Sequence, residues 1–79
     1  MTRRRKGPDV RERFGFAVKV RREALQLTQE ELADRAGIHR TYLSDVERGG
    51  RNIALINIER LAHALELRLA DLFRTVDSP

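Results

Sequence analysis

The sequence predicts an all-α fold, a compact five-helix bundle, and three observations lead to it. Only two prolines occur among the 79 residues, and both lie near the ends, at positions 8 and 79. Between them, apolar residues recur every three or four positions, the period of a helix face, and do not alternate as in a strand. A chain of this length holds one small core, so dimerisation would add useful stability.

The first helix is expected from about Asp9 to Leu25. Along one face it carries apolar residues at helical spacing, a pattern that Arg21 interrupts. The members of this face are Val10, Phe14, Ala17, Val18 and Leu25. Phe16 and Val20 lie on the other side and are interpreted as isolated exposed residues.

Two short helices follow in close succession. Thr28 and Glu31 have the spacing of a capping box, which opens a helix over residues 29–36 with Leu32, Ala33 and Ala36 facing inward. Gly37 ends it, because glycine readily takes the positive φ that turns the chain at once. The next helix is expected from about His39 to Arg48, with Leu43 and Val46 inward, and it ends at Gly49 and Gly50.

The C-terminal third predicts two more helices. The buried face of the fourth is expected to hold Ile53, Leu55, Ile58, Leu61, Ala62 and Leu65. The fifth is short, from about Leu69 to Phe73. The chain then divides into a basic arm over residues 1–8, a folded domain over residues 9–74 and a frayed end over residues 75–79.

Composition excludes several classes of function. Without cysteine the chain has no disulfide, no thiolate nucleophile and no soft zinc ligands. His39 and His63 are expected on different helices, and no glycine-rich phosphate loop follows a strand, so we expect no enzyme, no metal, no cofactor and no small-molecule ligand. The absence of a long apolar run or a secretory segment predicts a cytoplasmic protein with no membrane contact.

The positive charge is concentrated at the N-terminus. Arg3, Arg4, Arg5 and Lys6 account for the whole net charge of +4, which leaves 12 basic and 12 acidic residues elsewhere. Affinity for nucleic acid would therefore come from local patches and from this arm, unless the arm is simply a solvated terminus.

The two short helices form a helix-turn-helix pattern. Ala33 is small enough for a close helix crossing, and Ile38 would fill the turn. Leu43 and Val46 would anchor the second helix, leaving its opposite face free. That face holds Arg40, Thr41, Ser44 and Asp45, which are neighbours at helical spacing and can enter a DNA major groove together.

These residues resemble a known family. The segments LTQEELA, from Leu27 to Ala33, and GIHRTYLSDVERG, from Gly37 to Gly49, are similar to the phage repressor and Cro type (xenobiotic response element) helix-turn-helix family. The resemblance covers about residues 14–73. Residues 40–44 and 47–52 are most similar to the controller proteins of restriction-modification systems, which are small dimers that bind paired operator half-sites on double-stranded DNA.

Base-reading roles follow from this resemblance and from side-chain chemistry. Arg40 is the best candidate for a guanine edge, Thr41 for a thymine methyl group, and Ser44 for a weaker contact. Tyr42 would contact the DNA backbone or report its shape, or else be a half-buried tyrosine with a solvated hydroxyl. Asp45 would accept from a cytosine amine, repel wrong sequences or orient Arg48.

The resemblance also implies phosphate contacts and one structural pair. Gln29 stands at a helix N-terminus, where a phosphate can bind, although it could be a plain exposed residue. The other expected phosphate contacts are Arg48, Arg51 and Asn52, and Arg51 could also reach a base. Arg22 and Glu47 are expected to form a buried ion pair that braces the first helix against the reading helix.

Two positions depart from the family pattern. Gln26 stands where glycine is usual, so a positive φ there would be strained. Arg68 stands where the last helix usually has a good capping residue, which puts that boundary in doubt.

The sequence therefore predicts a homodimeric DNA-binding regulator. Ile56, Leu69 and Phe73 are candidates for the dimer seam, although they could instead complete the core. An antitoxin-type or other stand-alone repressor of its own operon is the alternative, but the chain has no long extra segment suited to wrapping a toxin.

Overall fold

The computed structural model describes residues 7–77, which form five helices and no strand. They are α1 (Val10–Ala24), α2 (Gln29–Ala36), α3 (Arg40–Glu47), α4 (Leu55–Ala64) and α5 (Leu69–Asp77). The predicted all-α, five-helix fold is confirmed. The basic residues at positions 3–6 lie outside the described residues.

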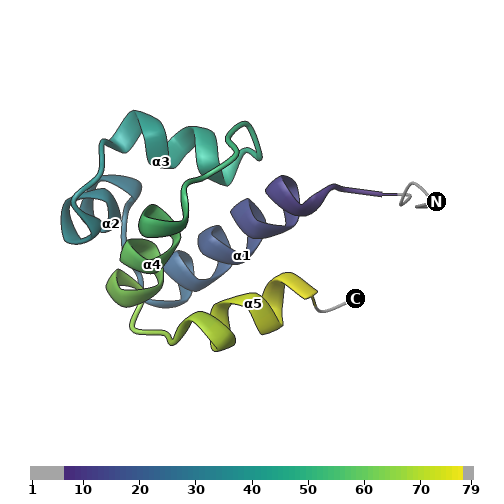
Figure 1. Ribbon diagram of the computed structural model, residues 1–79. Coiled ribbons are helices and arrows are strands. Elements are labelled where there is room, and N and C mark those ends of the chain that lie inside the picture. Colours follow the sequence, from purple (N-terminus) through teal and green to yellow (C-terminus); the bar gives the residue numbers. More distant parts are fainter. Residues whose placement is uncertain (1–6, 78–79) are drawn as a thin grey trace.

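The long helix α1 is the centre of the arrangement (Figure 1). It packs against α3 on one side and α5 on the other, while α2 packs against α3 and α4. The helix-turn-helix formed by α2 and α3 is thus supported from beneath by α1 and α4. Within the described part of the chain, no helix is long and apolar enough to cross a membrane.

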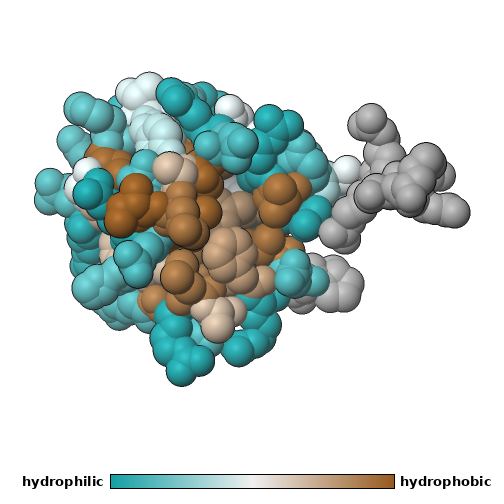
Figure 2. Space-filling model, viewed as in Figure 1, coloured by the Kyte–Doolittle hydropathy of each residue, from teal (hydrophilic) through white to brown (hydrophobic). Residues whose placement is uncertain are grey.

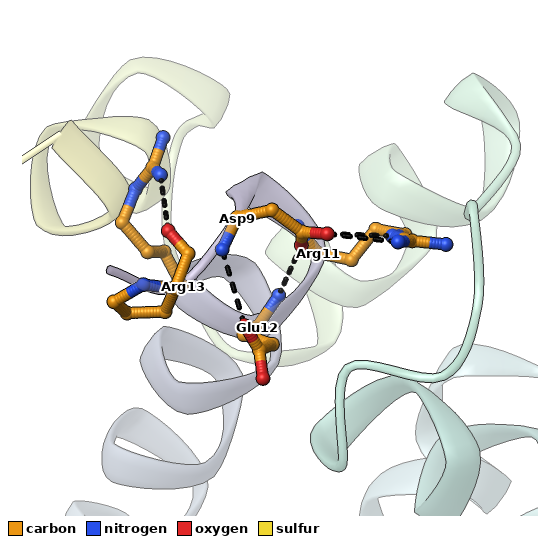
Figure 3. Close-up of polar contacts among 5 residues, drawn as sticks. Asp9, Arg11, Glu12 and Arg13 are labelled. Atoms are coloured by element: carbon orange, nitrogen blue, oxygen red, sulfur yellow. Dashed lines mark hydrogen bonds and ion pairs between the residues drawn. The ribbon is translucent and has the colours of Figure 1, made fainter. Parts of the chain in front are cut away.

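Capping boxes fix where the first two helices begin. In the predicted box of α2, the backbone N–H of Glu31 donates to Thr28 Oγ1 (3.0 Å) and that of Thr28 donates to Glu31 Oε1 (2.8 Å). A second box begins α1, where Asp9 caps the helix and Glu12 Oε1 accepts from the Asp9 N–H at 3.1 Å (Figure 3). In the sequence, Asp9 stands three residues before Glu12, which is the spacing of a capping box.

The core lies where α1, α4 and α5 meet the helix-turn-helix. Its members are Phe14, Ala17, Val18, Leu32, Ala33, Ala36, Leu43, Val46, Leu61, Ala62, Leu65, Leu72 and Val76. Three expected members of buried faces, Leu25, Ile53 and Ile58, are only partly buried and pack against this core. Two others are exposed. Leu55 is 76 % exposed and Val10 is 53 % exposed, because each is the first residue of its helix and lies beyond the part that the neighbouring helices cover.

The last helix is longer than predicted. It continues past Phe73 to Asp77, so residues 75–77 of the segment expected to be frayed are helical. Two interactions hold this end, namely the burial of Val76 in the core and a hydrogen bond from Arg13 Nε to the Val76 carbonyl (3.3 Å). The remaining residues of that segment, 78–79, lie outside the described residues.

Two non-glycine residues end helices in the left-handed region. Gln26 has φ 60°, as expected from its place in the family pattern, and Glu66 has φ 62°. After each of them, the next residue donates a backbone hydrogen bond back across the final turn, from Leu27 to Arg22 and from Leu67 to Ala62. Such a conformation is strained for a residue with a side chain.

The boundary placed in doubt at Arg68 is capped from within the helix. α5 begins at Leu69, and the Asp71 carboxylate accepts a hydrogen bond from the Arg68 backbone N–H at 3.4 Å. Asp71 therefore replaces the missing capping side chain at this boundary.

Candidate nucleic-acid interface

Helix α3 lies at the molecular surface with one face anchored and the other free (Figure 1). Leu43 and Val46 are fully buried, while Arg40 and Thr41 are exposed in its first turn. Ser44 and Asp45 are partly exposed on the next turn. His39, predicted as the first residue of this helix, is instead its N-cap residue with an extended backbone and no capping hydrogen bond from its side chain.

A buried ion pair braces this helix. Arg22 donates from Nε to Glu47 Oε2 (2.7 Å) and from Nη2 to Glu47 Oε1 (3.0 Å), and its Nη1 donates to the Leu27 carbonyl (2.8 Å). The side chains of Arg22 and Glu47 are only 11 % and 3 % exposed. The hydrogen bonds to Glu47 raise the pKa of Arg22, so the guanidinium stays charged. The pair holds α1 in register with the end of α3.

Gln29 belongs to the same network. Its Nε2 donates to Glu47 Oε1 at 2.9 Å. The side chain that was expected to contact a phosphate is therefore bonded to the last residue of α3. The first turn of α2 still offers its free backbone N–H groups at the surface. Sequence reasoning missed this contact, because it joins residues that are far apart in the chain.

A glycine inside α1 allows the close approach of α3. A Cβ atom built on Gly15 would lie 2.2 Å from the Val46 carbonyl oxygen and 2.8 Å from that of Glu47. The two helix backbones are therefore nearly in contact. The signal in the sequence is a glycine within an otherwise good helix, where it costs about 1 kcal/mol relative to alanine.

Basic side chains cluster at the C-terminal end of α3. Arg48 and Arg51 both form ion pairs with Asp45, and Arg48 Nη1 also donates to Ser44 Oγ at 2.7 Å. The guanidinium of Arg51 lies over the ring of Tyr42, 5.1 Å from its centre. Thus three expected base contacts and two expected phosphate contacts form one surface group.

The loop after α3 keeps its basic residues close to that helix. Gly49 has φ 80°, and a Cβ atom there would lie 2.7 Å from Glu12 Cγ, so both conformation and space require glycine. Arg51 and Asn52, which follow Gly50, are exposed. The loop therefore extends the polar face of α3 without covering it.

Tyr42 is half-buried with its hydroxyl in a hydrogen bond. Its ring packs against the core, and Asn57 Nδ2 donates to the hydroxyl oxygen at 3.3 Å. Asn57 was not expected in the site. Its contact ties the reading helix to α4.

The candidate dimer residues lie over α4 and α5. Ile56 is 55 % exposed and Leu69 is 36 % exposed, while Phe73 is partly buried against Phe14 with ring centres 5.9 Å apart. Apolar side chains gather in the middle of the face shown in Figure 2. A hollow of about 110 Å³ borders the region, lined in part by Val10, Phe73 and Ile53.

Among residues 7–77, no group of three or more metal-ligating side chains comes together. Of the described residues predicted to contact DNA, all except Gln29 lie on α3 or in the loop that follows it.

Comparison with known proteins decides the family. A family model described as helix-turn-helix matches residues 18–72. The chain belongs to the helix-turn-helix family. This family comprises DNA-binding transcription regulators, so the predictions of a DNA-binding regulator and of no enzymatic activity are confirmed.

Two relatives share most of their length with this helix-turn-helix chain. It is 43 % identical over 65 residues to the control protein C.BamHI of Bacillus amyloliquefaciens, covering 81 % of this chain and 80 % of the relative. The crystal structure of the restriction-modification controller protein C.AhdI from Aeromonas hydrophila superposes with a TM-score of 0.78 and 43 % identity, covering 80 % of this chain and 96 % of that one. The resemblance to controller proteins is confirmed.

A regulator named for a different target has a similar fold. The clp gene regulator ClgR from Corynebacterium glutamicum superposes with a TM-score of 0.84 at 30 % identity, covering 87 % of this chain and 73 % of that one.

Proposed function

We propose that this protein is a homodimeric controller of restriction-modification genes that binds paired operator half-sites through α3. The observation that carries the proposal is the anchored helix α3, whose free face presents Arg40 and Thr41 to solvent. Its likeness to control proteins over four-fifths of the chain supports the choice of target genes.

Different residues of α3 have different roles in DNA recognition. Arg40 stands at the start of α3, where its planar guanidinium can take both acceptors of a guanine, and Thr41 beside it can contact a thymine methyl group. Ser44 and Tyr42 lie further along the same surface, in reach of the sugar-phosphate backbone. Readout is therefore concentrated in the first turn of the helix.

The proposed phosphate contacts lie on either side of the base-reading residues. Arg48, Arg51 and Asn52 are exposed at the C-terminal end of α3 and in the next loop. At the opposite side, the free backbone N–H groups at Gln29 can hold a phosphate while its side chain stays on Glu47. These contacts would set the orientation of α3 in the groove.

A second copy would pack on the apolar region over α4 and α5. Ile56 on α4 and Leu69 on α5 are exposed there, and Phe73 lies about one turn after Leu69 on α5. Two-fold pairing would place two α3 helices about 34 Å apart, one helical turn of DNA. Pairing also doubles the surface that one short helix can present to the groove.

Binding to DNA upstream of the gene itself tests the proposal. We expect Arg40→Ala to weaken operator binding by about 1–3 kcal/mol, roughly 5- to 150-fold, and to relax the choice of one base pair. Arg35→Ala, which removes an exposed arginine of α2, is the control. Equal weakening on operator and random DNA would show that Arg40 contacts phosphate instead. A strict monomer, free and on DNA, would overturn the dimer.

The likeness to ClgR supports one alternative, a regulator of other genes. The genes that this protein controls distinguish the two. Loss of the regulator should change transcripts of an endonuclease or methyltransferase gene if it is a restriction-modification controller.

A further inference from the structure

Asp45 is the one carboxylate on the exposed face of α3, and both of its oxygens are engaged. Oδ1 pairs with Arg48 Nη2, and Oδ2 accepts from Arg51 Nε and Nη2, each at 3.3 Å. Only 24 % of the Asp45 side chain is exposed, against 66 % for Arg48 and 49 % for Arg51. One carboxylate thus bridges two basic side chains at the surface proposed to meet DNA.

Both guanidinium groups are folded back onto α3 by further contacts. Arg48 donates to Ser44 Oγ, and Arg51 lies over the Tyr42 ring. Tyr42 in turn is fixed by the hydrogen bond from Asn57. The two guanidinium groups are therefore tethered to α3, although both side chains remain largely exposed.

A carboxylate and a phosphate are the same kind of acceptor for a guanidinium, because each has two oxygens that can accept two parallel N–H hydrogen bonds. Asp45 competes with DNA phosphate for Arg48 and Arg51, and it does so within the same molecule, where its effective concentration is high. Once released, its negative charge would also face the DNA backbone. Both effects oppose binding to DNA that the protein contacts only through phosphates.

We propose that Asp45 is a specificity-determining residue that occupies Arg48 and Arg51 until an operator releases them. This inference rests on the proposed function. On random DNA, phosphate contacts alone do not offset the loss of the internal pairs, so the two arginines stay with Asp45. On the operator, base contacts from Arg40 and Thr41 bring α3 into the groove and the pairs are exchanged for phosphate. The released Asp45 carboxylate then accepts from a cytosine amine.

Asp45→Asn tests this, with the full-length chain and a short duplex of random sequence as the probe. The variant removes the charge but keeps the shape, and the Asp45 backbone carbonyl still accepts from Gly50 N–H. We expect it to bind random DNA about tenfold more tightly, the combined effect of releasing two exposed pairs. Binding to an operator selected from a random pool should change less than about threefold, because the variant no longer breaks the two pairs but also loses the contact of the carboxylate with cytosine. Specificity therefore falls.

Asp71→Asn is a matched control. Asp71 also bridges two arginines, Arg68 and Arg74, but it lies on α5, on the other side of α1 from α3 (Figure 1). The control removes the same charge and releases the same number of arginines. Its affinity for random DNA should stay within about twofold of the parent.

Salt dependence and a triple variant identify the groups responsible. Between about 50 and 200 mM salt, each further phosphate that the Asp45→Asn protein neutralises should steepen the dependence of log K on log salt concentration by about 0.9. Adding Arg48→Ala and Arg51→Ala to Asp45→Asn should abolish the tighter binding to random DNA. Tighter binding that survives in the triple variant would mean that Asp45 acts by repulsion alone, which overturns the inference.

Failure of the inference and failure of the proposed function look different. If the parent protein selects an operator but Asp45→Asn leaves random-DNA affinity and salt dependence unchanged, or weakens binding, the inference is wrong and the proposed function stands. If Asp71→Asn matches Asp45→Asn, the effect is one of net charge and the inference is again wrong. If the folded parent binds no duplex at all, the proposed function fails, and the inference with it. Circular dichroism confirms that each variant is folded.

Discussion

The buried pair between Arg22 and Glu47 gives the sharpest prediction about stability. Glu47 accepts three hydrogen bonds, two from Arg22 and one from Gln29, and its side chain is 3 % exposed. Glu47→Ala would leave the Arg22 charge buried with only the Leu27 carbonyl as a partner. Stranding one member of such a pair costs about 3–5 kcal/mol.

That cost is large for this chain. A domain of 79 residues has a total free energy of unfolding of about 4–12 kcal/mol. In a domain of this size, each kcal/mol lowers the Tm by about 4–8 °C, so Glu47→Ala should lower the Tm by at least about 12 °C. At the lower end of that free-energy range, the variant is partly unfolded at room temperature.

Thermal unfolding followed by far-ultraviolet circular dichroism measures the effect. The control is Arg35→Ala, which breaks an exposed pair with Glu66 (3.6 Å) and should cost no more than about 1 kcal/mol. Replacing both partners, as Arg22→Met with Glu47→Leu, should recover much of the loss because no charge is left buried. A Glu47→Ala Tm within a few degrees of the Arg35→Ala value would refute the reasoning.

Three further variants test local features. Gly15→Ala should destabilise the fold by about 1–3 kcal/mol despite alanine's better helix propensity, because its Cβ would meet the Val46 carbonyl at 2.2 Å; a Tm equal to or above that of the parent would contradict the close helix contact. Gln26→Gly should raise the free energy of unfolding by about 0.5–1 kcal/mol in urea titrations, because it relieves a side chain at φ 60°; a lower midpoint would mean that the conformation is unstrained. Hydrogen bonds from the helix cap lower the pKa of Glu31 from its usual 4.5, so its contribution is present above about pH 4.5 and is lost as the pH falls through the lowered value. Glu31→Gln should therefore flatten the fall of Tm on acidification, and an unchanged acid profile would argue against the cap as its cause.

Local patterns in the sequence determined the helices and the reading face. The capping box at Thr28, the turn at Gly37 and the inward spacing of Leu43 and Val46 act within a few residues, so each could be recognised without a fold. The resemblance to the family added the pairing of Arg22 with Glu47, which spacing alone does not predict.

Tertiary structure decided what depends on distance between remote residues. The contact of Gly15 with Val46, the hydrogen bond from Gln29 to Glu47 and the burial of Val76 all join different helices. Their physical basis is the packing of α3 against α1 and α2 and of α5 against α1, which no local pattern specifies. The exposure of Leu55 has the same origin, since the hydrophobic period marks a helix face but not how far along it the neighbouring helices reach.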